Sequence, residues 1–188
     1  TLISGVLAST TLEAKKEPAK SKKMPVGIQL YTLRDVIGKD LSGTLQNVSK
    51  IGYKSVEAYG FDGKFFSTPA KDFRKMCADL GMVISSTHTG ITAENAMMYT
   101  EKAAEAGLEY LVLPSFMGRP EKTLDDFKKV AEEMNRIGEI TKKAGIQFGY
   151  HNHNFEFRPM DGKLPYDVLL AETDPGLVTF EMDIFWVV

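Results

Sequence analysis

The chain has 188 residues, enough for one domain of ordinary size, and its 43% hydrophobic and 26% charged content is typical of a folded globular protein. Its formal net charge of −2 shows no basic excess, which argues against a protein that binds nucleic-acid phosphates. The single cysteine, Cys77, excludes an internal disulfide framework and a cysteine-based zinc cluster, and no apolar run approaches the roughly 18 residues of a membrane span.

The first 23 residues are expected to precede the folded domain. Residues 1–14 (TLISGVLASTTLEA) are small and apolar and resemble the end of a signal peptide, although a basic start is absent; a short disordered leader is the alternative. The lysine-rich stretch Lys15–Lys23 has no apolar periodicity and is typical of a solvated linker. We therefore expect a leader over 1–23, a domain over 24–188, and a periplasmic or otherwise exported protein, with a cytoplasmic location as the alternative.

From residue 26 onward, short apolar runs alternate with longer amphipathic ones. Each strand–helix unit spans about 25–35 residues, the size of a βαβ unit with parallel strands. Thr92 and Thr123 are the predicted N-caps of the third and fourth helices. The predicted strands are Val26–Tyr31, Ser55–Tyr59, Met82–Thr87, Tyr110–Leu113, Gln147–His151 and Val178–Asp183, and the predicted helices are Leu41–Ile51, Ala70–Leu80, Ala93–Ala106, Thr123–Ala144 and Tyr166–Ala171.

This rhythm indicates either an open doubly wound sheet or a closed (β/α)₈ barrel. The first strand leads into LYTLRD (Leu30–Asp35) instead of a glycine-rich phosphate loop, and this weakens the nucleotide-binding alternative. A (β/α)₈ barrel has about 250 residues. The sequence therefore predicts an α/β fold of the TIM-barrel type that is incomplete at the C-terminus and truncated after strand six.

Polar side chains gather at the carboxyl ends of the predicted strands, where parallel α/β folds carry their binding groups. All three histidines fall at such ends: His88 after the third strand, and His151 and His153 at the fifth. The sixth strand delivers Glu181 and Asp183, which alternation places on the same face, although the direction in which Glu181 points is open. Further polar residues at these ends are Gln29, Tyr31, Arg34, Glu57 and Tyr59.

Imidazole and carboxylate groups are the usual ligands of divalent transition metals, so one of the two histidines His151 and His153 could bind a metal together with Asp183, with at least one or two further ligands needed. In the alternative interpretation, His151 and His153 hydrogen-bond the backbone at a buried strand end, and Asp183 only orients one of them. Glu57 and Glu181 are candidate bases, or else strand-end carboxylates that face solvent.

Four segments carry a resemblance to a known family: VGIQLYTLRD, the pair Gly52–Tyr53 leading to Val56 and Glu57, GYHNHNFEF, and FEMDIFWVV. From about residue 25 to the end, the chain resembles the sugar phosphate isomerase/epimerase family. That family has the xylose isomerase-like (β/α)₈ barrel and is related to inosose dehydratases, ketose 3-epimerases and endonuclease IV.

The resemblance implies a divalent metal (Mn²⁺, Zn²⁺, Co²⁺ or Mg²⁺) in the barrel mouth, with His151 and Asp183 at the ligand positions of strands five and six. Many relatives place a glutamate where His151 stands, which puts a two-glutamate proton shuttle in doubt. Further ligands are expected from strands seven and eight, which this sequence does not contain. The catalytic candidates are Glu57, His88 and His153, and the substrate-binding candidates are these three with Tyr31 and Trp186. Tyr59 and Phe116 are further aromatics for a sugar face, with packing as the alternative role of each aromatic.

The resemblance implies an isomerase or epimerase that acts on a sugar or keto-sugar by proton abstraction next to a carbonyl, through an enediolate. The alternatives are a keto-glycoside lyase or hydratase on the same scaffold and a noncatalytic sugar-binding protein. Metal-dependent cleavage of abasic DNA is disfavoured by the acidic body. The expected partner is a small-molecule sugar, without nucleic acid or a membrane span, and an oligomer is possible.

Overall fold

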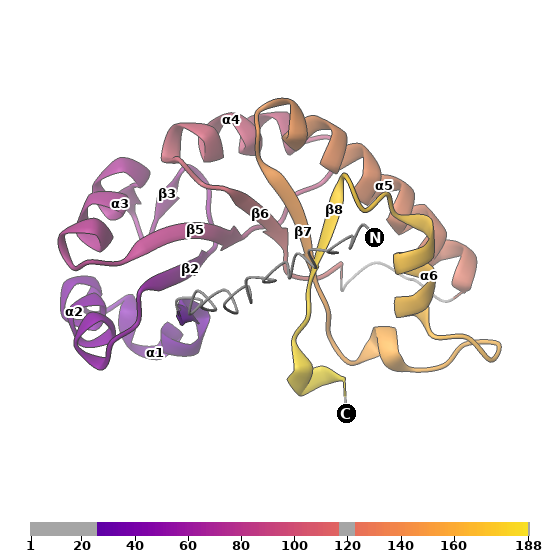
Figure 1. Cartoon of the computed structure of the whole chain (residues 1–188), viewed down its shortest axis with the longest axis horizontal. Coiled ribbons are helices and arrows are strands. Elements are labelled where there is room, and N and C mark those ends of the chain that lie inside the picture. Colours follow the sequence, from indigo (N-terminus) through magenta and orange to yellow (C-terminus); the bar gives the residue numbers. More distant parts are fainter. Residues whose placement is uncertain (1–25, 117–122, 188) are drawn as a thin grey trace, which may run out of the picture.

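The computed structural model describes residues 26–116 and 123–187, so the leader expected over 1–23 lies outside the described residues. Six parallel strands form one sheet with the order β1-β2-β5-β6-β7-β8, which leaves β1 and β8 at its two edges. Figure 1 shows these strands converging from an outer arc of helices. The strands are β1 (Gly27–Gln29), β2 (Ser55–Tyr59), β5 (Val83–His88), β6 (Tyr110–Leu113), β7 (Gln147–His151) and β8 (Val178–Glu181).

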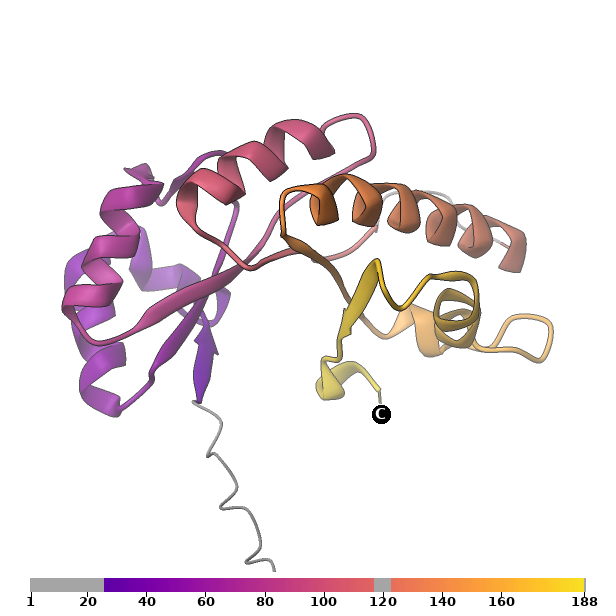
Figure 2. The same ribbon diagram turned by 45° about the horizontal axis from the view of Figure 1, so that its top comes forward.

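The helices form a second layer on one face of the sheet, as Figure 2 shows. The hydrophobic core lies between the two layers and is formed largely by the alternate strand residues that point toward the helices. None of the described helices is both long and apolar enough to cross a membrane. The helices are α1 (Arg34–Ile37), α2 (Leu41–Ile51), α3 (Ala70–Asp79), α4 (Ala96–Ala106), α5 (Leu124–Lys143) and α6 (Pro165–Glu172).

The observed order of the main strands and helices follows the prediction, and most differences lie at element ends. The first strand is shorter than predicted because residues Leu30–Leu33 turn into a 3₁₀ helix, η1. The prediction of Thr92 as an N-cap is wrong. Helix α4 begins only at Ala96, and Thr92 instead donates its backbone N–H to Asn95 Oδ1 in the preceding loop.

Thr123 is confirmed as the N-cap of α5, where it forms a capping box with Asp126. The sequence pattern did not reveal a short antiparallel hairpin, β3 (Lys64–Phe65) with β4 (Thr68–Pro69). Two further 3₁₀ helices, η2 (Phe155–Phe157) and η3 (Ile184–Trp186), follow β7 and β8.

Alternation along β2 separates core residues from site residues. Val56 and Ala58 are buried under the helices, whereas Glu57 and Tyr59 line a cavity on the other face of the sheet. The regular pairing of β2 with β5 is interrupted after Val56. Val56 pairs with Ile84 and the next residue, Glu57, pairs with Ser86, so Ser85 has no partner residue in β2. This bulge places Ser86 and His88 on the cavity face, beside Glu57 and Tyr59.

Helix α5 packs so closely on the segment before β8 that Gly138 has no room for a side chain. A Cβ at Gly138 would lie 2.7 Å from the carbonyl oxygen of Leu177. We expect Gly138→Ala to destabilise the fold by about 1–3 kcal/mol through overpacking, although helix propensity alone favours alanine by about 1 kcal/mol. The comparison is made from urea-unfolding midpoints.

Gly38 offers the matched control for this substitution. It lies at the C-cap of α1 with φ −71°, and a Cβ there meets no atom within 4 Å. Gly38→Ala should be neutral or slightly stabilising. Equal unfolding midpoints for the two variants would contradict the close contact at Gly138.

Candidate active site at the strand ends

A cavity of about 790 Å³ opens where the six strands end. Its wall is formed by residues of β2, β5, β7 and β8 and of the loops that follow the strands, so side chains far apart in the sequence meet there. All seven candidate site residues from the sequence line this one cavity: Tyr31, Glu57, His88, His151, His153, Asp183 and Trp186.

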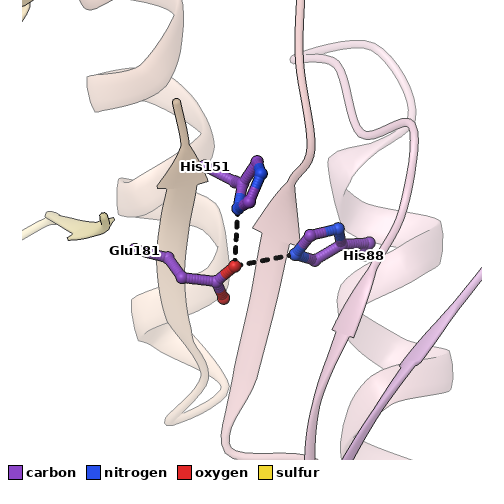
Figure 3. A group of neighbouring side chains, drawn as sticks. All are labelled: His88, His151 and Glu181. Atoms are coloured by element: carbon purple, nitrogen blue, oxygen red, sulfur yellow. Dashed lines mark hydrogen bonds and ion pairs between the residues drawn. The ribbon is translucent and has the colours of Figure 1, made fainter. Parts of the chain in front are cut away.

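At the floor of the cavity, the carboxylate of Glu181 joins two histidines (Figure 3). Its Oε1 lies 2.7 Å from Nδ1 of His151 and 3.0 Å from Nε2 of His88. Because an ionised carboxylate only accepts hydrogen bonds, both imidazole nitrogens donate to it. The three side chains come from β5, β7 and β8 and point toward one another, which answers the open question of where Glu181 points.

Glu57 extends this cluster toward β2. Its Oε1 lies 3.1 Å from His88 Nε2, and its Oε2 accepts a hydrogen bond from the hydroxyl of Ser86 at 2.6 Å. The side chain of Glu57 is only 15% exposed. Glu57 is therefore not a solvent-facing strand-end carboxylate, and His88 faces two carboxylates at once.

The two carboxylates control the protonation of His88. Burial lowers the pKa of His88, but the hydrogen bonds to Glu181 and Glu57 outweigh it and raise the pKa to about 9. Gln29 lies on the other side of the His88 ring. Its Oε1 accepts from the backbone N–H of Tyr31, and its amide nitrogen lies 3.3 Å from His88 Nδ1. Burial likewise opposes ionisation of Glu181, yet the hydrogen bonds from His151 and His88 hold its pKa well below the usual range.

The second nitrogen of His151 faces Asp183. The distance from His151 Nε2 to Asp183 Oδ2 is 3.6 Å. Asp183 Oδ1 accepts from the backbone N–H of Phe185, so Oδ2 is the oxygen left to face the histidine. The buried Asn152 fixes this segment, because its amide donates to the carbonyl of Asp183 at 3.1 Å and accepts from its N–H at 2.9 Å.

Two donor sets in this region have the chemistry of a divalent metal site. Two ligand atoms that each lie about 2.0–2.2 Å from one ion are separated from each other by roughly 3–3.6 Å. The 3.6 Å between His151 Nε2 and Asp183 Oδ2 lies within this range. In that arrangement Glu181 accepts from the other nitrogen of the same histidine, as carboxylates behind metal-bound histidines do. The alternative set is His88, His151 and Glu181, whose ligand atoms all lie within 4.8 Å of one another.

His153 is held between aromatic rings. Its ring centroid lies 5.4 Å from Trp186 and 6.2 Å from Phe155. Its Nδ1 is buried and has no hydrogen-bond partner among the described residues, and burial together with the neighbouring His151 lowers its pKa. His153 is therefore a neutral imidazole at neutral pH. Its backbone N–H is anchored by the buried Glu156.

The remaining aromatics divide between cavity and core. Tyr31 and Tyr59 line the cavity on the β1–β2 side, in edge-to-face contact with ring centroids 5.1 Å apart. Phe116 is buried and stacks on Tyr150, so packing is its role.

Sequence reasoning missed three residues that support the site: Ser86, Asn152 and Glu156. Asn152 lies between the two histidines of GYHNHNFEF, and that position was the available signal. The partner of Ser86 depends on the β-bulge, which the sequence pattern does not reveal.

Comparisons with known proteins agree with this architecture. The family model described as "Xylose isomerase-like TIM barrel" matches residues 45–165. A solved sugar phosphate isomerase/epimerase from Parabacteroides distasonis is 34% identical with a TM-score of 0.75, over 90% of this chain and 71% of that one.

A D-psicose 3-epimerase from Clostridium cellulolyticum, solved with D-tagatose, has 10% identity and a TM-score of 0.63, over 87% and 64% of the two chains. The IolI protein, solved with zinc, has 12% identity and a TM-score of 0.67, over the same shares. These last two likenesses concern the fold, and no curated protein matches the chain.

The raised pKa of His88 predicts a pH-dependent stability. Because the pKa rises from 6.5 in the unfolded chain to about 9 in the fold, the stabilisation is complete below pH 6.5 and is lost as the pH rises through about 9. Urea unfolding of the metal-free protein should show a loss of about 2–3 kcal/mol between pH 6.5 and 9.5. Glu181 does not contribute in this window, because its lowered pKa acts only at acidic pH.

His88→Gln should remove most of this pH dependence, and His153→Gln is the control that should retain it. A pH dependence in His88→Gln as steep as in the unchanged protein would disprove the assignment.

Proposed function

Since this chain belongs to the xylose isomerase-like TIM-barrel family, we propose that it acts as a divalent-metal-dependent isomerase or epimerase on a sugar or keto-sugar. The observation that carries the proposal is the cluster of Glu57, His88, His151 and Glu181 in a cavity at the strand ends. It combines donors suited to a metal with carboxylates suited to proton transfer. The fold likeness to an epimerase solved with a ketose supports the choice of substrate class.

His151 and Asp183 are the residues that would hold the metal. His151 Nδ1 donates to Glu181, so its Nε2 carries a lone pair on the side where Asp183 Oδ2 lies. A bound divalent ion would polarise the carbonyl of the substrate and so lower the barrier to proton abstraction on the neighbouring carbon. The IolI protein, which shares the fold, was solved with zinc, and this supports the proposal of a divalent metal in this chain.

Glu57 is the proposed base. Its carboxylate lines the cavity, and it removes the proton from the carbon next to the carbonyl while the electron pair of the broken C–H bond forms the enediolate. His88, a cation below its pKa of about 9, lies beside both Glu57 and Glu181, where it stabilises negative charge. Return of the proton from Glu57 to the adjacent carbon gives an isomer, whereas an epimer forms when a different acid, on the opposite face, protonates the original carbon.

Two aromatic groups on opposite sides of the cavity are suited to hold the sugar. Tyr31 and Tyr59 lie on the β1–β2 side, and His153 and Trp186 lie on the β7–β8 side. Aromatic faces pack against the apolar C–H faces of sugars, while the neutral His153 offers a ring nitrogen to a hydroxyl group.

Solvent-deuterium exchange tests the reaction. A panel of keto-sugars is incubated with the protein and Mn²⁺ in D₂O, and deuterium on the carbon next to the carbonyl is measured by NMR and mass spectrometry. We expect exchange with at least one sugar, and a loss of about 10²–10⁴-fold in Glu57→Gln, because that variant lacks the base. Glu109→Gln is the matched control, since Glu109 is exposed before the start of β6, away from the cavity.

Other outcomes of this assay point to other functions. Sugar binding without exchange would contradict catalysis and support a noncatalytic binder. Exchange with loss of a leaving group would support a keto-glycoside lyase or hydratase.

Metal binding tests the ligands separately. Titration calorimetry with Mn²⁺ and with Zn²⁺ should show binding that His151→Ala and Asp183→Asn abolish. Glu181→Gln should weaken it by about 10–100-fold, because an outer carboxylate orients the ligand. His153→Ala should retain the affinity of the unchanged protein. If His88→Ala abolishes binding and Asp183→Asn does not, the ion lies in the His88–His151–Glu181 set and the assignment of Asp183 is wrong.

A further inference from the structure

We propose that Ser86 is a positioning residue that holds the Glu57 carboxylate in the orientation required for proton transfer. The inference rests on the proposed function, because it assigns a residue that orients Glu57, the proposed base. Ser86 lies in β5 and acts through Glu57, without itself contacting the substrate.

The contact between the two residues is short and sheltered. The Ser86 hydroxyl donates to Glu57 Oε2 at 2.6 Å, and both residues are partly buried. Hydrogen bonds to an ionised acceptor are the stronger kind, and this distance lies within their range. With Oε2 bound by the serine, Oε1 is the oxygen that faces His88 at 3.1 Å. The serine thus decides which oxygen of Glu57 meets the histidine.

The backbone places Ser86 for this role. Along the pairing of β2 with β5, Val56 pairs with Ile84 and Glu57 pairs with Ser86, so Ser85 is the extra residue of a bulge. Regular pairing would place Ser85 opposite Glu57 and would turn His88 toward the helices, because a shift of one residue exchanges the faces of a strand. The bulge therefore aims the hydroxyl of Ser86 and the ring of His88 at Glu57 together.

Neighbouring residues of β5 confirm the change of face. Ile84 is buried opposite Val56 and Thr87 is buried opposite Ala58, both on the core side. In a regular strand, side chains at positions i and i+2 lie on the same side, yet Ile84 and Thr87 share a side at positions i and i+3. The spacing leaves Ser86 and His88 on the cavity side, where a plain alternating pattern would not place them.

Ser86→Ala tests the role, with Ser86→Thr as the conservative variant and Ser85→Ala as the matched control in the same strand. In the exchange assay, we expect Ser86→Ala to lower kcat by about 10–100-fold, the loss of one hydrogen bond to a charged group, with KM and Mn²⁺ affinity changed less than about threefold. Ser86→Thr should recover most of kcat, and Ser85→Ala should leave it unchanged. An unchanged kcat in Ser86→Ala would overturn the proposal.

A double variant separates positioning from a general structural effect. If Ser86 acts only through Glu57, adding Ser86→Ala to Glu57→Gln should lower the residual rate no further. If the loss of kcat in the double variant equals the product of the losses in the two single variants, Ser86 acts by another route and the assignment is overturned. Urea unfolding of each variant confirms that the rates are compared among folded proteins.

A readout without activity keeps this test independent of the proposed function. In a crystal structure of Ser86→Ala, the Glu57 side chain should be rotated away from the position that it has in a crystal structure of the unchanged protein. In a crystal structure of Ser85→Ala, Glu57 should keep that position. If the unchanged protein exchanges no sugar but Glu57 moves as expected, the proposed function fails and the positioning role stands. If Glu57 stays in place without the hydroxyl, the positioning role fails whatever the activity.

Discussion

The site depends on the carboxylate of Glu181, which accepts from His88 and His151 through a single oxygen. A carboxylate taken out of water is costly unless donors surround it, and here two imidazoles from neighbouring parts of the sheet supply them. The same contacts set the orientation of both imidazole rings. The Nε2 atom of His151 faces Asp183, and the Nε2 atom of His88 lies beside Glu57. One ion-pair centre thus sets the direction of the other polar groups at the cavity floor.

The parallel sheet makes this centre possible, because it brings the carboxyl ends of β2, β5, β7 and β8 to one edge. Parallel pairing alone does not complete the arrangement. The bulge at Ser85 turns His88 to the cavity side, and Asn152 ties the end of β7 to the start of η3 through two hydrogen bonds to the backbone of Asp183. Local departures from regular strands therefore aim the side chains that the regular strands bring together.

The sequence predicted the order of the main sheet and the meeting of the strand-end residues, since both follow from periodicity and parallel topology. Strands Ser55–Tyr59, Tyr110–Leu113 and Gln147–His151 have the predicted bounds. The hairpin β3–β4 escaped prediction because two-residue strands carry no periodic pattern. The partner of Ser86 also escaped, because a bulge changes the face of a strand without changing its residue types. The direction of Glu181 stayed open because the residue types of β8 alone do not show which face meets the cavity.

The identity of residue 151 and that of residue 181 are physically linked. Oε1 of Glu181 lies 2.7 Å from Nδ1 of His151, so a carboxylate at position 151 would bring a second negative charge close to Glu181. Two carboxylates placed that close together would raise the pKa of one partner and favour its protonation when no cation is bound. A histidine reverses the effect, because its Nδ1–H is stabilised by Glu181 while its Nε2 stays free to bind an ion. The histidine at position 151 thus stabilises the Glu181 carboxylate without a cation, and it still directs Nε2 toward Asp183 Oδ2.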